Sequence, residues 1–137
     1  MRQYIVFVVL GLVVASCGSA TAELDVANAP AVNVLAATEV DELLAAPPTG
    51  LVVLDVRTPE EVAAGHLPDQ RNIDFYDADF AAQLDGLNKD VPYLVYCRSG
   101  NRSGTAVQQM RELGFSTIYE LEGGVLAWEQ AGLTLER

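Results

Sequence analysis

The sequence contains few of the residues that build metal sites and nucleic-acid-binding surfaces. Its 137 residues include one histidine, His66, and two cysteines, Cys17 and Cys97. A single histidine cannot assemble a cluster of metal ligands, so no metal site is expected. Basic residues are also scarce, since 8 lysines and arginines stand against 19 acidic residues and give a net charge of −11. Phosphate contacts need a basic face, so nucleic acid is not an expected partner.

The chain is long enough for one ordinary domain and no more. Hydrophobic residues make up 50% of it, which is enough to build a packed core. Each candidate motif occurs once and no internal repeat is visible. A tandem two-domain architecture is therefore not expected.

Residues 1–16 differ in composition from the rest of the chain. One arginine is their only charged residue, and the apolar run over residues 4–15 is too short to span a bilayer comfortably as a mature helix. These features predict a signal peptide. Its end, Val14-Ala15-Ser16-Cys17, resembles the bacterial lipobox, in which a signal peptidase cuts before a cysteine that then carries lipid. We therefore expect lipidation at Cys17 and an exported protein anchored to the periplasmic or extracytoplasmic face of a bacterial cell membrane. An ordinary leader cleaved a few residues later is the alternative.

The rest of the chain divides into a tether and one folded domain. Residues 17–31 are small and polar with no clear period, which is typical of a tether, and the domain covers residues 32–137. The predicted strands are residues 32–35, 51–54, 72–75, 91–96 and 117–119. The predicted helices are residues 39–46 with Thr38 as N-cap, 59–64, 77–87, 102–113 and 125–131. Since parallel strands need crossover helices, this alternation predicts a three-layer α/β domain with a central, mainly parallel sheet of about five strands.

The segment over residues 91–103 carries the main candidate for chemistry. It predicts a buried strand that runs into a short loop at Cys97 and then into a helix. Backbone N–H groups of the loop, the positive end of the helix and the arginines Arg98 and Arg102 would surround the thiol. Such surroundings lower the pKa of a cysteine from about 8.5 to roughly 3.5–7.5. Cys97 is therefore a candidate nucleophile, and a small buried core residue is the alternative.

At this point the sequence resembles the rhodanese-like sulfurtransferases in their single-domain form. The resemblance covers residues 34–133. It rests on the loop 97–103 (Cys-Arg-Ser-Gly-Asn-Arg-Ser), on residues 54–60 (Leu-Asp-Val-Arg-Thr-Pro-Glu), and on residues 121–124 (Leu-Glu-Gly-Gly) with Trp128. Residues 65–68 (Gly-His-Leu-Pro) also fit, whereas residues 69–71 (Asp-Gln-Arg) stand where the family usually has small residues.

The resemblance implies transfer of a sulfane sulfur through a persulfide on Cys97. The donor would be a small anion such as thiosulfate, the acceptor would be cyanide or a thiol, and no cofactor would be needed. The residues implied to bind the substrate are those of the loop: Arg98, Ser99, Gly100, Asn101, Arg102 and Ser103.

Two other functions remain open from the sequence. Related phosphatases and arsenate reductases resemble Cys-x5-Arg, whereas the spacing from Cys97 to Arg102 is Cys-x4-Arg, with Ser103 at the next position. The shorter loop favours sulfur transfer. A protein that carries a persulfide without rapid turnover, or that docks a partner, would use the same cysteine or none.

Three further polar residues have less certain roles. Asp55 and Arg57 follow the second predicted strand and share an edge with Cys97, and a structural role for them is favoured over lining the site. A catalytic pair between Cys97 and His66 is disfavoured, because the helix end and the arginines already supply what a thiolate needs. The sequence leaves all three assignments open.

Overall fold

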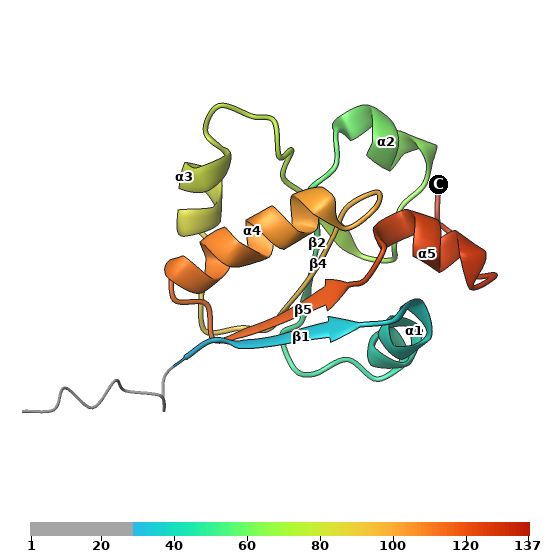
Figure 1. Ribbon diagram of the computed structural model, residues 1–137, viewed down its shortest axis with the longest axis horizontal. Coiled ribbons are helices and arrows are strands. Elements are labelled where there is room, and N and C mark those ends of the chain that lie inside the picture. The colour runs from blue at the N-terminus through green and yellow to red at the C-terminus, as the bar shows by residue number, and fades with distance from the viewer. Residues whose placement is uncertain (1–28) are drawn as a thin grey trace, which may run out of the picture.

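The computed structural model describes residues 29–137, which form a parallel sheet with helices on both faces (Figure 1). The predicted signal peptide, Cys17 and the tether up to residue 28 lie outside the described residues. The strands of the sheet lie in the order β1-β5-β4-β2-β3, and every neighbouring pair is parallel. Their bounds are β1 (Ala31–Leu35), β2 (Val52–Asp55), β3 (Gln70–Asn72), β4 (Tyr93–Tyr96) and β5 (Thr117–Leu121). The predicted fold class, a three-layer α/β domain with a five-stranded sheet, is confirmed.

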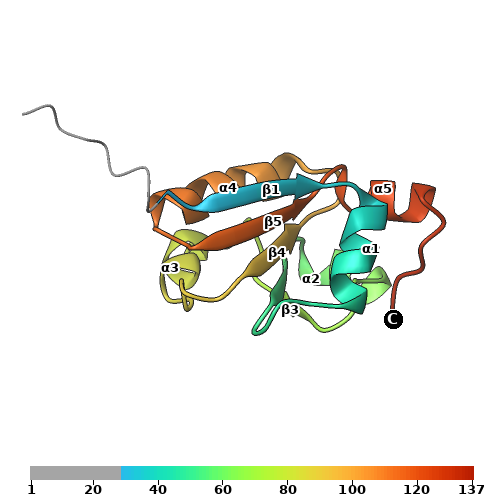
Figure 2. The same cartoon turned by 90° about the horizontal axis from the view of Figure 1, so that it is seen from below.

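The helices divide between the two faces of the sheet (Figure 2). Helices α3 (Phe80–Asp85) and α4 (Asn101–Glu112) pack on one face, and α1 (Ala37–Ala45) and α5 (Gly124–Gln130) pack on the other. The short helix α2 (Pro59–Ala64) follows β2. Alternate residues of β4 enter the two cores, Tyr93 and Val95 on the α4 side and Leu94 and Tyr96 on the α5 side. Burial on both faces explains why this strand is a continuous apolar run.

Parallel strands bring the site to one edge of the sheet. Asp55 ends β2, Leu121 ends β5, and Cys97 directly follows β4, so all three lie at the carboxyl edge. Ligands of open α/β sheets bind beyond this edge. The fold therefore places the loop after Cys97 where a substrate is expected.

The third predicted strand is wrong in position. The strand was expected over residues 72–75, whereas β3 is Gln70–Asn72 and pairs only with β2. Being an edge strand, it does not need apolar residues, so the apolar pattern around Ile73 pointed to the wrong residues. Ile73 lies just beyond the strand, where its side chain is buried and its N–H bonds the carbonyl of Asp55 at 3.0 Å.

Two predictions about helices are also wrong. The helix expected over residues 77–87 is the shorter α3, because residues 77–79 form a turn in which the N–H of Phe80 bonds the carbonyl of Asp77. Thr38 is not the N-cap of α1, since it lies inside the first turn and Ala36 takes the cap position. The Glu39 carboxylate accepts a hydrogen bond from the N–H of Ala36 at 2.8 Å. Glu39, which lies within the helix, therefore caps its N-terminus.

The other boundaries agree with the predictions to within a few residues. Helix α2 covers residues 59–64 as predicted, with Thr58 as its N-cap and Gly65 after it. Between residues 29 and 137, no helix combines the length and the apolar character that crossing a bilayer requires.

Candidate functional site

Cys97 lies beneath a tight loop that joins β4 to α4. Its side chain and backbone together are 1% exposed. Gly100 is the N-cap of α4 and has a left-handed backbone with φ of 97°, which favours glycine. Its N–H donates to the Cys97 Sγ at 3.1 Å. The loop thus turns a backbone donor directly onto the sulfur.

Burial and hydrogen bonding act in opposite directions on this thiol. Burial raises the pKa of Cys97, whereas hydrogen bonds from Ser103, Ser99 and Gly100 lower it, and the pKa lies below its ordinary value overall. The Ser103 hydroxyl has one proton, and it also lies 2.8 Å from Glu120 Oε1 and 3.0 Å from the Gly100 carbonyl. The backbone N–H groups, which have no such competition, are therefore the steadier donors to the sulfur. They favour the thiolate, which is the nucleophilic form.

Helix α5 holds the loop from behind. The N–H groups of Val125 and Leu126, in its first turn, donate to the carbonyls of Cys97 and Arg98 at 3.0 Å each. This approach requires Gly124, because a Cβ there would come within 2.7 Å of the Arg98 carbonyl carbon and oxygen. Gly124 also has a φ of 59°, in the left-handed region. This contact, which the sequence did not predict, explains the second glycine of the motif, whereas a Cβ on Gly123 would meet the Ala127 Cβ at 2.8 Å.

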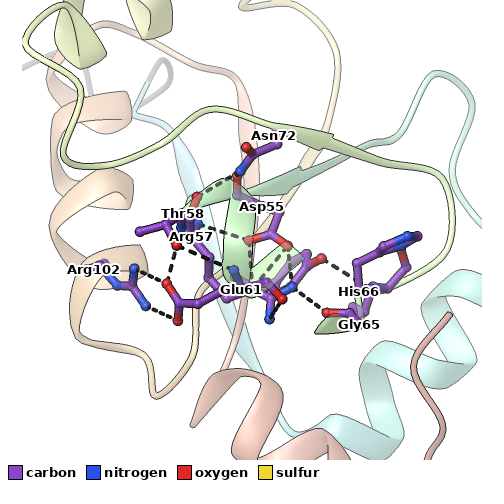
Figure 3. A network of polar contacts seen from close by, with 10 residues as sticks. Asp55, Arg57, Thr58, Glu61, Gly65, His66, Asn72 and Arg102 are labelled. Carbon is purple, nitrogen blue, oxygen red and sulfur yellow. Dashed lines mark hydrogen bonds and ion pairs between the residues drawn. The ribbon is translucent and has the colours of Figure 1, made fainter. Parts of the chain in front are cut away.

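The two arginines of the loop have different surroundings. Arg98 is exposed and lines a cavity of about 290 Å³ together with Glu61, Val125 and Glu129. Arg102 instead donates from both terminal nitrogens to the two carboxylate oxygens of Glu61, at 2.8 Å each (Figure 3). Its guanidinium also lies 5.5 Å from the centre of the Tyr76 ring. Within residues 29–137, Arg98 thus lines the cavity without an ion pair, whereas Arg102 is paired with Glu61.

The remaining loop residues differ in burial. Ser99 and Asn101 are exposed, and Ser103 is fully buried beneath the start of α4. Glu120 of β5 bonds Ser103 from below, and burial raises the pKa of its carboxyl although that hydrogen bond opposes the shift. Neither Glu61 nor Glu120 was a candidate from the sequence. Glu61 had a local signal, since it stands three residues after the cap Thr58, but its partner Arg102 is 41 positions away.

Asp55 and Arg57 form a buried ion pair that shapes the edge of the site (Figure 3). They are 0% and 3% exposed, and the Arg57 guanidinium bonds both carboxylate oxygens at 2.6–3.1 Å. Arg57 also donates to the carbonyls of Gly65 and Glu61, and the Asn72 amide donates to the carbonyls of Asp55 and Arg57. These contacts tie β2, α2 and β3 together, as a structural role requires, and Arg57 also lines the cavity beside Arg98.

The hydrogen bonds of His66 are made with backbone groups. Its Nδ1 lies 2.9 Å from the carbonyl of Leu67, and its backbone pairs with Glu136. No hydrogen bond joins it to Cys97 in the described part of the chain. Over residues 29–137 there is also no cluster of histidine, cysteine and carboxylate side chains suited to a metal ion.

The fold and the site define an α/β protein that presents a thiol in a loop of backbone N–H groups. The chain belongs to the rhodanese-like domain family, because the family model "Rhodanese-like domain" matches residues 36–131. A solved structure of a rhodanese-related protein from Thermoplasma volcanium superposes with a TM-score of 0.66 and 31% identity, over 76% of this chain and 97% of that one.

The chain is also similar to curated proteins. The thiosulfate sulfurtransferase GlpE of Pseudomonas putida is 40% identical over 80 residues, which are 58% of this chain and 70% of GlpE. The uncharacterized protein slr1261 of Synechocystis is 39% identical over 83 residues, which are 61% of this chain. The match spans only 45% of the length of slr1261. Together with the family model, the similarity to GlpE supports sulfurtransferase activity in the broad sense.

The contact between α5 and the loop predicts the effect of Gly124→Ala. The added Cβ must push the Cys97 and Arg98 carbonyls away, so the N–H groups of the loop lose their aim at the sulfur. We expect a loss of about 2 kcal/mol or more in the free energy of unfolding and a raised thiol pKa for Cys97. Urea unfolding and the pH dependence of thiol alkylation measure the two effects.

Gly132→Ala is the matched control for this prediction. Gly132 has a φ of 78°, and a Cβ there would meet no atom within 4 Å. This variant carries only the backbone strain, which costs about 1 kcal/mol, and it lacks the clash. Equal destabilisation by both variants, with an unchanged pKa of Cys97 in Gly124→Ala, would show that the contact does not set the loop.

Proposed function

We propose that this protein is a single-domain sulfurtransferase that moves a sulfane sulfur through a persulfide on Cys97. The observation that carries the proposal is the Gly100 N–H at 3.1 Å from the sulfur, in a loop that lowers the pKa of the thiol. Membership of the rhodanese-like family and the similarity to a relative named thiosulfate sulfurtransferase support it.

The reaction has two displacement steps at sulfur. The Cys97 thiolate attacks the outer sulfur of thiosulfate, the sulfur–sulfur bond of the donor breaks, and sulfite leaves with the electron pair. Cys97 then carries a persulfide with a negative terminal sulfur. Cyanide or a thiolate attacks that terminal sulfur, takes it as thiocyanate or a new persulfide, and restores the Cys97 thiolate. No oxidant, reductant, metal or organic cofactor takes part.

The loop residues have separate roles in this proposal. The N–H groups of Ser99, Gly100 and Ser103 stabilise negative charge on the cysteine sulfur and on the persulfide. Arg98, which is exposed at the cavity, attracts the anionic donor and steadies the leaving sulfite. Arg102 adds positive charge near the loop, offset by Glu61.

Two alternatives predict different behaviour from the same site. A persulfide carrier would take up sulfur on Cys97 without rapid turnover. A phosphatase or arsenate reductase would need a loop wide enough for a whole tetrahedral anion, and the Cys-x4-Arg spacing from Cys97 to Arg102 is one residue short of that pattern. Sulfur transfer is therefore favoured over oxyanion chemistry.

Loading with thiosulfate tests the proposal. The wild-type protein should gain the mass of one sulfur atom on the peptide that contains Cys97, and cyanide should remove it with release of thiocyanate. Cys97→Ser should abolish both steps, because a hydroxyl with no base beside it is a far weaker nucleophile. Hydrolysis of an aryl phosphate, dependent on Cys97, should be absent. Failure to form a persulfide with any anionic sulfur donor would refute the proposal.

We also propose that the protein is exported and anchored to a membrane through lipid on Cys17. The support is the sequence Val14-Ala15-Ser16-Cys17 at the end of a short apolar run. The wild type should fractionate with membranes, and Cys17→Ser should be released or remain unprocessed. A soluble wild-type protein whose N-terminus lies beyond residue 17 would contradict the assignment.

A further inference from the structure

The ion pair between Glu61 and Arg102 occupies both terminal nitrogens of the second arginine in the loop after Cys97. Both terminal nitrogens of Arg102 bond Glu61, one to each carboxylate oxygen, at 2.8 Å (Figure 3). A guanidinium uses this same two-pronged arrangement to bind two oxygens of an oxyanion. Glu61 therefore acts as an internal substitute for such an anion.

Glu61 is held in this position by its own helix. Its Oε2 accepts the N–H of Thr58 at 3.2 Å, and its N–H donates to the Thr58 hydroxyl at 3.4 Å. Its carbonyl accepts a hydrogen bond from Arg57, which is itself anchored on the buried Asp55. The carboxylate is thus fixed at both its backbone and its side chain. A substrate anion that competes for Arg102 must displace a preorganised partner.

The pair is partly exposed, and Glu61 is its member that lines the cavity. The side chains of Arg102 and Glu61 are 15% and 27% exposed, and Glu61 lines the same cavity as Arg98. Hydrogen bonding from Arg102 lowers the pKa of Glu61 to about 2, so the carboxylate is fully charged at neutral pH. Two arginines, Arg57 and Arg98, line this cavity. Arg57 is paired with Asp55, whereas Arg98 forms no ion pair within residues 29–137.

From these contacts we infer that Glu61 is a specificity-determining residue, which neutralises Arg102 and so favours sulfane-sulfur donors with one negative charge over the dianion thiosulfate. The inference rests on the proposed function. It names organic thiosulfonates and persulfides, which are monoanions at the reacting sulfur, as the substrate class. Coulomb energy scales with the charge of the ligand, so a carboxylate near the site penalises a dianion about twice as much as a monoanion.

Glu61→Gln is the variant that isolates this charge. Glutamine serves at the third helical position of a capping box as glutamate does, so α2 should keep its cap. Glu60→Gln is the matched control, since Glu60 is exposed, lies one residue earlier and removes the same charge from a side chain that does not pair with Arg102. The two donors to compare are thiosulfate and methanethiosulfonate, which carries the same outer sulfur with one charge fewer.

The expected result is a shift in donor selectivity at low ionic strength. Glu61→Gln should raise kcat/KM about tenfold for thiosulfate and about threefold for methanethiosulfonate, since the two factors follow the charges of two and one. The shift should shrink as salt is added, should be absent in Glu60→Gln, and should disappear when Arg102→Gln is added to Glu61→Gln. An unchanged ratio of the two kcat/KM values in Glu61→Gln would overturn the inference.

A second measurement does not depend on sulfur transfer. Cys97 can be alkylated by iodoacetate, an anion, or by iodoacetamide, which is neutral, and peptide mass spectrometry follows each rate. Glu61→Gln should raise the ratio of the iodoacetate rate to the iodoacetamide rate about threefold, with no change in Glu60→Gln. If the wild type transfers sulfur from neither donor, the proposed function fails, but the ratio of the two alkylation rates still tests the role of Glu61. An unchanged ratio in Glu61→Gln would refute that role.

Discussion

The pair of hydrogen bonds from the first turn of α5 to the carbonyls of Cys97 and Arg98 is the contact on which the site depends. With these two carbonyls turned toward α5, the N–H groups that follow can turn toward the sulfur, as the Gly100 N–H does. The approach needs Gly124, where a side chain would collide with the loop. A thiol that burial alone would keep protonated is thereby held with a lowered pKa.

The buried pair of Asp55 and Arg57 supports the opposite side of the same edge. It joins the end of β2 to α2 and to the turn at Gly65, and it holds the Glu61 backbone through a hydrogen bond to the Glu61 carbonyl. Breaking such a pair leaves an uncompensated buried charge, which is strongly destabilising. The positive charge offered to a substrate is therefore set by scaffold contacts, with Arg98 exposed and Arg102 occupied.

The sequence predicted those features that local patterns determine. The continuous apolar run of β4 and the glycine of the loop placed Cys97 at a strand end before a helix, and the structure agrees. The sequence-based prediction failed where tertiary contacts determine the structure, as for the edge strand β3, whose pairing does not require apolar residues. The pair of Glu61 and Arg102 joins residues 41 positions apart, and the contact of Gly124 joins the start of α5 to the loop between β4 and α4. No periodic pattern in the local sequence predicts either contact.

The pH dependence of alkylation at Cys97 tests most directly whether this loop activates the thiol. The full chain is treated with iodoacetamide over a range of pH, and the rate is followed on the peptide that contains Cys97. Because the hydrogen bonds of the loop lower the thiol pKa, the midpoint of the rate profile should lie clearly below about 8.5, the value of a free cysteine. A midpoint at or above about 8.5 would contradict the assignment of Cys97 as an activated nucleophile.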